Sequence, residues 1–116
     1  MADKVLRSHI KLNAGDIVVT PTAMTASNEY LLDLQGSDYK TVFVFHNTNA
    51  TASRVTIAIG DGIQGVGENI EFTVEQNKVV PVVVDSGAYK IVAGENKGFA
   101  KVTVSSGCNV SVVELP

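Results

Sequence analysis

Two histidines and one cysteine are the first residues in this sequence that suggest chemistry. His9 and His46 are the only histidines, and Cys108 is the only cysteine. A zinc site needs three or four histidine, cysteine or carboxylate ligands at suitable spacing, and nothing is spaced to join either histidine. One cysteine also excludes an intramolecular disulfide and a Cys-rich zinc site. We therefore predict no metal site and interpret both histidines as structural or surface residues.

A glycine-rich run, Gly60-Asp-Gly-Ile-Gln-Gly65, matches the pattern G-x-G-x-x-G of dinucleotide-binding proteins. In those proteins a helix follows the glycines, because its N-terminus binds the pyrophosphate. Here residues 68–74 alternate between apolar and polar types, as a strand does, so no strand–helix–strand unit fits. Asp61 and Glu68 lack the acidic companions at alternate positions that an EF-hand-like calcium loop supplies. The run predicts a loop between two strands, and no cofactor is expected.

The candidate nucleophiles lack the surroundings that nucleophilic catalysis needs. Ser86 lies in Asp-Ser-Gly rather than in a Gly-x-Ser-x-Gly elbow, and no motif links a histidine to it. A reactive cysteine needs a positive environment, and Ser106, Gly107 and Asn109 around Cys108 supply none. We predict no catalytic residue and expect that the protein is not an enzyme.

Length and charge exclude several other classes. The chain has 116 residues, 45% of them hydrophobic and 18% charged, which predicts one ordered domain. Nine basic against twelve acidic residues give a net charge of −3, whereas a nucleic-acid groove needs clustered positive charge. The longest apolar runs, of about five residues, are too short to cross a membrane. Residues 1–7 lack the apolar core of a signal peptide. We expect neither nucleic acid nor a membrane as a partner.

The composition favours strands over helices. Valine occurs nineteen times, threonine nine, isoleucine seven and leucine six, with ten glycines. Branched side chains at Cβ lose rotamer freedom in helices and pack well on a pleated surface. About eight short strands, separated by turns every 8–12 residues, are typical of a β-sandwich or barrel. We predict an all-β chain with a β-sandwich fold, Ig-like or jelly-roll-like. Its strands are expected at residues 16–20, 40–46, 54–59, 70–74, 79–84, 89–92, 101–104 and 110–114. Residues 29–34 fit either a further strand, which we favour, or one helical turn.

Four segments carry more specific expectations. Residues 40–46 should lie in the middle of a sheet, with Phe43 and Phe45 on one face. Pro81 removes a ladder donor, so its strand belongs at a sheet edge or a bulge. Residues 20–27 are small and uncharged and predict an extended crossing. The last two strands are expected to form a hairpin around residues 105–107.

A family resemblance supplies the functional expectation. Three segments carry it: His46-Asn-Thr-Asn-Ala-Thr-Ala-Ser-Arg-Val-Thr-Ile-Ala-Ile-Gly-Asp-Gly-Ile-Gln-Gly65, Val84-Asp-Ser-Gly-Ala-Tyr-Lys90 and Val110-Ser-Val-Val-Glu-Leu-Pro116. Together, over roughly residues 40–116, they resemble small structural proteins of tailed bacteriophages, of the capsid decoration (cement) type. The resemblance implies a virion protein, made in the bacterial host cytoplasm, that binds the outer capsid surface and bridges capsomers. It implies the major capsid protein as partner and a homo-oligomer, with a trimer favoured, and it carries over no functional residues.

The N-terminal segment is the candidate contact surface. We divide the chain into residues 1–15, an arm or first strand, and residues 16–116, a single β-sandwich domain. An arm can add to a sheet edge on a neighbour, so residues 2–14 are a hypothetical contact with the shell or a sister subunit. The candidate contact residues are Val5, Leu6, Arg7, His9, Ile10 and Leu12. A tail, head-fibre or head-completion component and a β-sandwich module that binds carbohydrate or protein remain alternatives.

Overall fold

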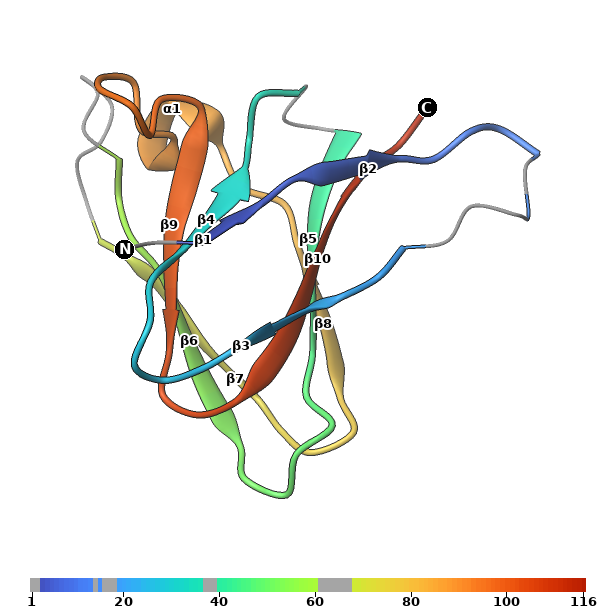
Figure 1. Cartoon of the computed structure of the whole chain (residues 1–116), viewed down its shortest axis with the longest axis vertical. Helices are drawn as coiled ribbons and strands as arrows, with labels where there is room; N and C mark the ends of the chain where they lie inside the picture. The colour runs from blue at the N-terminus through green and yellow to red at the C-terminus, as the bar shows by residue number, and fades with distance from the viewer. Residues whose placement is uncertain (1–2, 14, 16–18, 37–39, 61–67) are drawn as a thin grey trace.

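Ten strands and one helical turn make up the described part of the chain. A computed structural model describes residues 3–13, 15, 19–36, 40–60 and 68–116. Sheet A has the order β1-β4-β9-β6-β7, and sheet B has the order β2-β10-β5-β8, with β3 also paired to β10. The two sheets face each other in a sandwich (Figure 1), so the all-β sandwich prediction is confirmed. The elements are β1 (Asp3–Val5), β2 (Arg7–His9), β3 (Thr22–Met24), β4 (Tyr30–Asp33), β5 (Thr41–His46), β6 (Ser53–Ile57), β7 (Ile70–Val74), β8 (Val79–Val82), α1 (Ser86–Tyr89), β9 (Phe99–Val104) and β10 (Cys108–Glu114).

The N-terminal segment contributes a strand to each sheet. β1 pairs in parallel with β4 of sheet A, and β2 pairs in parallel with β10 of sheet B. The other pairings are antiparallel. Leu6, which lies between β1 and β2, is the residue at which the chain passes from one sheet to the other. Residues 3–9 therefore close one side of the sandwich.

The core follows from alternation along the strands. In β5, Phe43 and Phe45 are buried while Val42, Val44 and His46 are partly exposed, as predicted. The rings of Phe45 and Phe72 meet edge to face at 5.3 Å between centroids, a favoured aromatic geometry. β5 lies between β10 and β8, and β8, which contains Pro81, lies at the end of the described sheet. Both of these positional predictions are confirmed.

The predicted C-terminal hairpin is wrong, because its two strands belong to opposite sheets. β9 pairs with β4 and β6 in sheet A, whereas β10 pairs with β5 in sheet B. The Ser105 N–H donates to the Arg54 carbonyl at 3.0 Å, so the turn begins beside β6. Val104 and Cys108 both face the core, from opposite sides of it. A tight turn between two apolar runs does not by itself say whether the runs pair or cross the core.

Three further predicted segments differ from the structure. A strand at residues 89–92 is wrong: the Asp85 carbonyl accepts the N–H groups of Ala88 and Tyr89 and closes the helical turn α1. Of the strand expected at 16–20, residues 16–18 lie outside the described residues, and residues 19 and 20 are not in a strand. The expected crossing at 20–27 contains β3 instead, and β1 to β3 raise the strand number above the predicted eight.

Candidate functional site

The six candidate contact residues divide into buried and exposed members. Val5 is 6% exposed and belongs to the core cluster. Arg7 and Ile10 are partly buried. Leu6 and Leu12 are 67% and 77% exposed, and His9 is also exposed. The structure therefore places only Leu6, His9 and Leu12 where a partner can reach most of the side chain.

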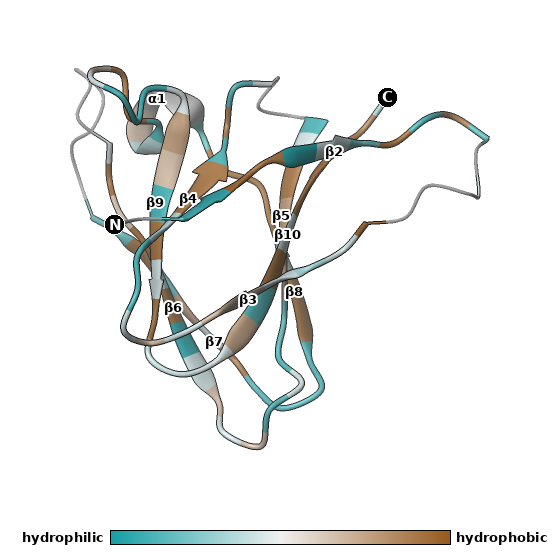
Figure 2. Cartoon of the chain, in the orientation of Figure 1, coloured by the Kyte–Doolittle hydropathy of each residue, from teal (hydrophilic) through white to brown (hydrophobic). Residues whose placement is uncertain are grey.

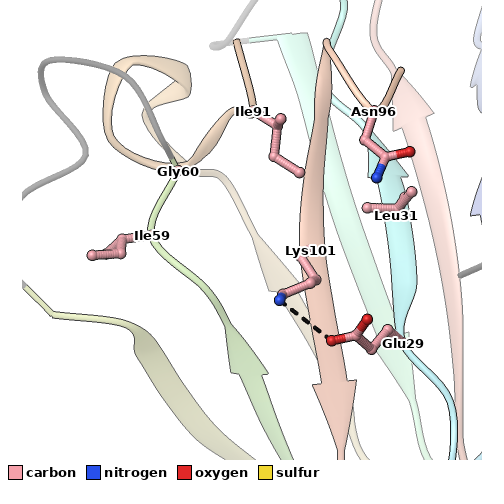
Figure 3. Close-up of a pocket in the computed structure, with 7 residues that line it drawn as sticks. All are labelled: Glu29, Leu31, Ile59, Gly60, Ile91, Asn96 and Lys101. Carbon is pink, nitrogen blue, oxygen red and sulfur yellow. Dashed lines mark ion pairs between the residues drawn. The ribbon is translucent and has the colours of Figure 1, made fainter. Parts of the chain in front are cut away.

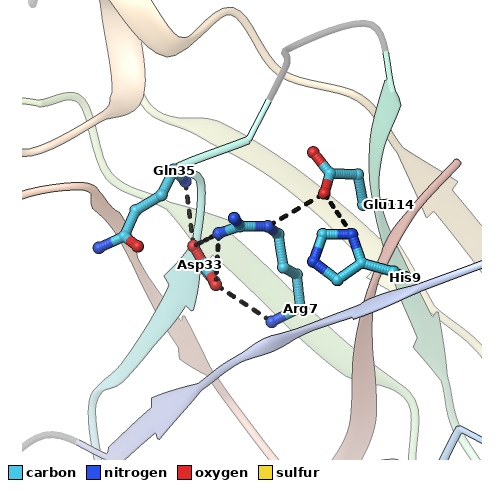
Figure 4. A network of polar contacts seen from close by, with 5 residues as sticks. All are labelled: Arg7, His9, Asp33, Gln35 and Glu114. Atoms are coloured by element: carbon cyan, nitrogen blue, oxygen red, sulfur yellow. Dashed lines mark hydrogen bonds and ion pairs between the residues drawn. The ribbon is translucent and has the colours of Figure 1, made fainter. Parts of the chain in front are cut away.

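Arg7 holds this segment in place through an ion network that joins both sheets. Its Nη1 lies 3.0 Å from each carboxylate oxygen of Asp33 on β4, and its Nε lies 3.1 Å from Oε1 of Glu114 on β10. The same Oε1 is 2.7 Å from Nδ1 of His9. The backbone N–H groups of Arg7 and Gln35 also donate to Asp33, at 3.2 and 3.0 Å. Figure 4 shows the guanidinium between the two carboxylates.

The electrostatics of this network stabilise the charge on Arg7. Burial alone would lower the pKa of Arg7, but the charge of Asp33 and hydrogen bonds to Glu114 and Asp33 outweigh it and raise the pKa. The Asp33 and Glu114 side chains are only 5% and 13% exposed, and removing Arg7 would leave the buried Asp33 carboxylate without its cation. The network fixes β2 against β4 and β10.

Leu6 and Leu12 flank the fixed strand β2. The Ile10 N–H donates to the Glu114 carbonyl at 2.8 Å, which extends the pairing with β10 by one residue. Beyond it, Figure 1 shows the chain leaving the body of the sandwich, and Asn13 has a positive φ of 62°, a left-handed conformation that asparagine tolerates. Two large apolar side chains are thus held in solvent on either side of an anchored strand. Such exposure is unremarkable for one residue, but a pair near a fixed strand suits a contact surface.

A shallow depression of about 330 Å³ lies on the outer side of sheet A. Its walls are partly aliphatic and partly polar, and Lys101 Nζ lies 3.3 Å from Glu29 Oε2 at one side (Figure 3). Sugar-binding sandwiches stack their ligand on exposed aromatic rings, and none of the six described aromatic residues is exposed. The two ionisable residues described in its lining, Glu29 and Lys101, are paired with each other. Its lining residues are Glu29, Leu31, Ile59, Gly60, Ile91, Asn96 and Lys101.

The residues considered for other chemistry are scattered. Cys108 is buried, and burial raises the pKa of its thiol, against smaller opposing effects of backbone hydrogen bonds at His46 and Asn109. No group of three histidine, cysteine or acidic side chains within the described residues is placed to hold a metal ion. Asp61 and the Ser86 side chain lie outside what is described. The described helix, a single turn, is far too short to cross a membrane.

Sequence reasoning missed the residues that anchor the N-terminal segment. Asp33 and Glu114 lie 26 and 107 positions from Arg7, and no local pattern connects residues at such distances. The one available signal was an acidic residue in each of two otherwise apolar strands, since a buried charge needs a partner. No protein-family model, no curated protein and no solved structure matches this chain.

Proposed function

We propose that this protein is a non-enzymatic structural component of a bacteriophage virion that decorates and stabilises the outer surface of the capsid. The resemblance of residues 40–116 to capsid decoration proteins supports the assignment. A β-sandwich with an ion-paired N-terminal strand gives the rigidity that such a role needs. The proposed partner is the major capsid protein, and the proposed location is the capsid surface.

The observation that carries the proposal is the exposure of Leu6 and Leu12 beside the anchored strand β2. Residues 3–9 already pair within their own chain, so a neighbour would be met by side chains here rather than by a free strand. Burying a leucine side chain gains roughly 1.5–3 kcal/mol, and the rigid segment loses little conformational entropy on binding. We therefore assign Leu6 and Leu12, with His9 between them, to the capsid contact.

A sedimentation titration against undecorated heads of the same phage tests the function. We expect saturation at roughly hundreds of copies per head, since repeated symmetry sites on a shell are filled together. Saturation at about a dozen copies or fewer would instead indicate a vertex, portal or tail component. No co-sedimentation would overturn the proposal and leave a β-sandwich binding module.

Point variants test the contact better than a deletion of residues 2–14. Such a deletion removes Val5 from the core and Arg7 from its ion network, so lost binding would also follow from lost folding. We expect Leu6→Ser/Leu12→Ser to weaken capsid binding at least tenfold while the fold is retained. The matched control is Val92→Ser, which alters a side chain that is 47% exposed elsewhere. Equal binding by both variants would exclude this segment as the contact.

A further inference from the structure

The outward surface of sheet B has an unusual composition for a sandwich. We use "the outer face of sheet B" for the outward side chains of β5, β8, β10 and Val83, which continues the alternation of β8. Antiparallel sheets normally turn polar residues to solvent, yet Val79 and Val83 are 54% and 57% exposed here. Figure 2 shows β8 mostly brown, the colour of hydrophobic residues. The apolar residues of this face are Val42, Val44, Val79, Pro81 and Val83, together with Val113, which is only 9% exposed.

These residues form one continuous surface. In the strand register, Val44 lies between Ser111 of β10 and Pro81 of β8, and Val42 lies beside Val113. One row further, His46 lies between Asn109 and Val79. Within β5, β8 and β10, none of the outward described residues is lysine, arginine, aspartate or glutamate; the exposed Lys40, which precedes β5, lies at the border of the face.

The outer face of sheet A is different. It carries Lys4, Arg54, Glu71 and Lys101 as outward residues of four strands. Arg54 Nη2 lies 2.9 Å from Glu71 Oε1, and Lys4 Nζ lies 5.0 Å from the centre of the Phe99 ring. This face has the charged and solvated character expected of a sandwich surface.

We propose that two copies of this chain associate face to face through the outer face of sheet B. This inference goes beyond the proposed function and does not rest on it. A charged surface placed on this face would lose its hydration without gaining an ionic partner. Of the two outer sheet faces that a second copy offers, the outer face of sheet B is the one whose strands carry no charged outward residue among those described. Two identical uncharged sheets can pack about 10 Å apart around a twofold axis, which brings no like charges together there.

The area of the outer face of sheet B determines how tightly two copies should associate. Three strands about 4.8 Å apart, each about six residues long at about 3.3 Å per residue, give roughly 300 Å² in projection. A stable interface buries about 800 Å² per partner. The pair should therefore be weak, with a dissociation constant above about 10 μM, and should form where the local concentration is high. Addition of a strand at the edge of β8 is disfavoured, because Pro81 lies within that edge strand.

Analytical ultracentrifugation of the full chain from about 10 μM to 1 mM tests the proposal over the concentrations where a weak interface is populated. We expect the mass to rise from 12.2 kDa towards twice that value. Val79→Lys/Val83→Lys should remain monomeric, because both copies would carry the new charges into the contact. The matched control, Thr73→Lys/Val92→Lys, adds the same charge at two exposed residues off this face and should associate like the wild type. Circular dichroism establishes that each variant is folded.

Three outcomes would overturn the proposal. One is a wild type that stays monomeric at the highest concentration. Another is equal association by Val79→Lys/Val83→Lys and the wild type. The third is a limiting mass of three chains, which requires a head-to-tail contact between different surfaces and would favour the trimer expected from the phage resemblance. If the double variant fails to fold, Val44→Lys on the central strand β5 replaces it with the same expectation.

Discussion

The guanidinium of Arg7 and the carboxylate of Asp33 join the two sheets at the side of the sandwich closed by the N-terminal segment. Arg7 belongs to β2 of sheet B and Asp33 to β4 of sheet A, and Nη1 contacts both carboxylate oxygens at 3.0 Å. The Arg7 N–H also donates to Asp33. The contact therefore fixes the position of β2 as well as neutralising a buried charge. Leu6, which directly precedes Arg7, is exposed beside this contact.

Replacing Arg7 should cost much more stability than replacing a surface arginine. Arg7→Ala leaves the buried Asp33 carboxylate without its cation and removes one of the partners of Glu114, so we expect about 2–4 kcal/mol lower free energy of unfolding. Arg54→Ala breaks an ion pair with Glu71 whose side chains are 57% and 47% exposed, and should cost less than about 1 kcal/mol. Urea denaturation of the two variants measures the difference. Equal losses would show that the network contributes no more than a surface pair.

Asn47 should contribute strongly to stability, because its side chain holds together the turns at one end of the sandwich. It is fully buried, and its Nδ2 donates to the carbonyls of Thr51 at 2.9 Å and Val74 at 2.8 Å. The backbone carbonyl of Asn47 accepts the Asn77 N–H at 2.7 Å. Asn47→Ala removes two donors and should lower the free energy of unfolding by about 2–3 kcal/mol. Asn47→Asp should be worse, because a carboxylate would face two carbonyl oxygens.

A neighbouring asparagine provides the control for that measurement. The amide of Asn49 donates to the Gly107 carbonyl at 2.9 Å in an exposed position, so Asn49→Ala should cost less than about 1 kcal/mol. Thermal and urea unfolding of the three variants give the order. A loss in Asn49→Ala as large as that in Asn47→Ala would mean that burial does not determine the cost.

Gly60 should not tolerate a side chain. A Cβ there would collide with the carbonyl oxygen of Lys90, and the Gly60 N–H donates to Ala88 in α1 at 2.7 Å, so neither backbone can move freely. Gly60→Ala should lower the free energy of unfolding by about 1–3 kcal/mol. Gly15, where a Cβ would meet nothing within 4 Å, provides the control, and Gly15→Ala should change stability by less than about 0.5 kcal/mol. An unchanged midpoint for Gly60→Ala in urea would contradict the predicted clash.

The strands that local patterns predict best are those whose two faces differ most. Phe43 and Phe45 alternate with less buried residues, and this alternation alone located β5 and its inner face. Pro81 located an edge because the missing N–H is a local property. The sheet to which each strand belongs was not predictable in the same way. The turn at residues 105–107 allows its two strands either to pair with each other or to lie in opposite sheets, and long-range contacts determine which of the two occurs. The candidate site had the same limit, since the partners of Arg7 lie on distant strands.

Cys108 should make the protein sensitive to alkaline pH. Its thiol is 2% exposed, and burial, the largest effect, raises its pKa above the ordinary value of 9.0 despite nearby backbone hydrogen bonds. The folded state thus binds the proton more tightly than the unfolded state. This stabilising contribution is complete below pH 9.0 and is lost as the pH rises from there through the folded pKa. We expect the free energy of unfolding to fall on this alkaline side, and to fall less in Cys108→Ala, whose small cavity lowers stability equally at all pH values.

Alkylation of the thiol gives an independent measurement of the same burial. The thiolate is the reactive form, so iodoacetamide should label native Cys108 at pH 8 at least a hundredfold more slowly than the urea-unfolded chain. Labelling of the native protein should then follow opening of the fold, and should accelerate in Arg7→Ala about tenfold for each 1.4 kcal/mol of stability lost. Equal rates for native and unfolded chains would show that Cys108 is accessible. That result would also remove the physical basis for the alkaline transition, because a solvated thiol has no reason to hold its proton beyond its ordinary pKa.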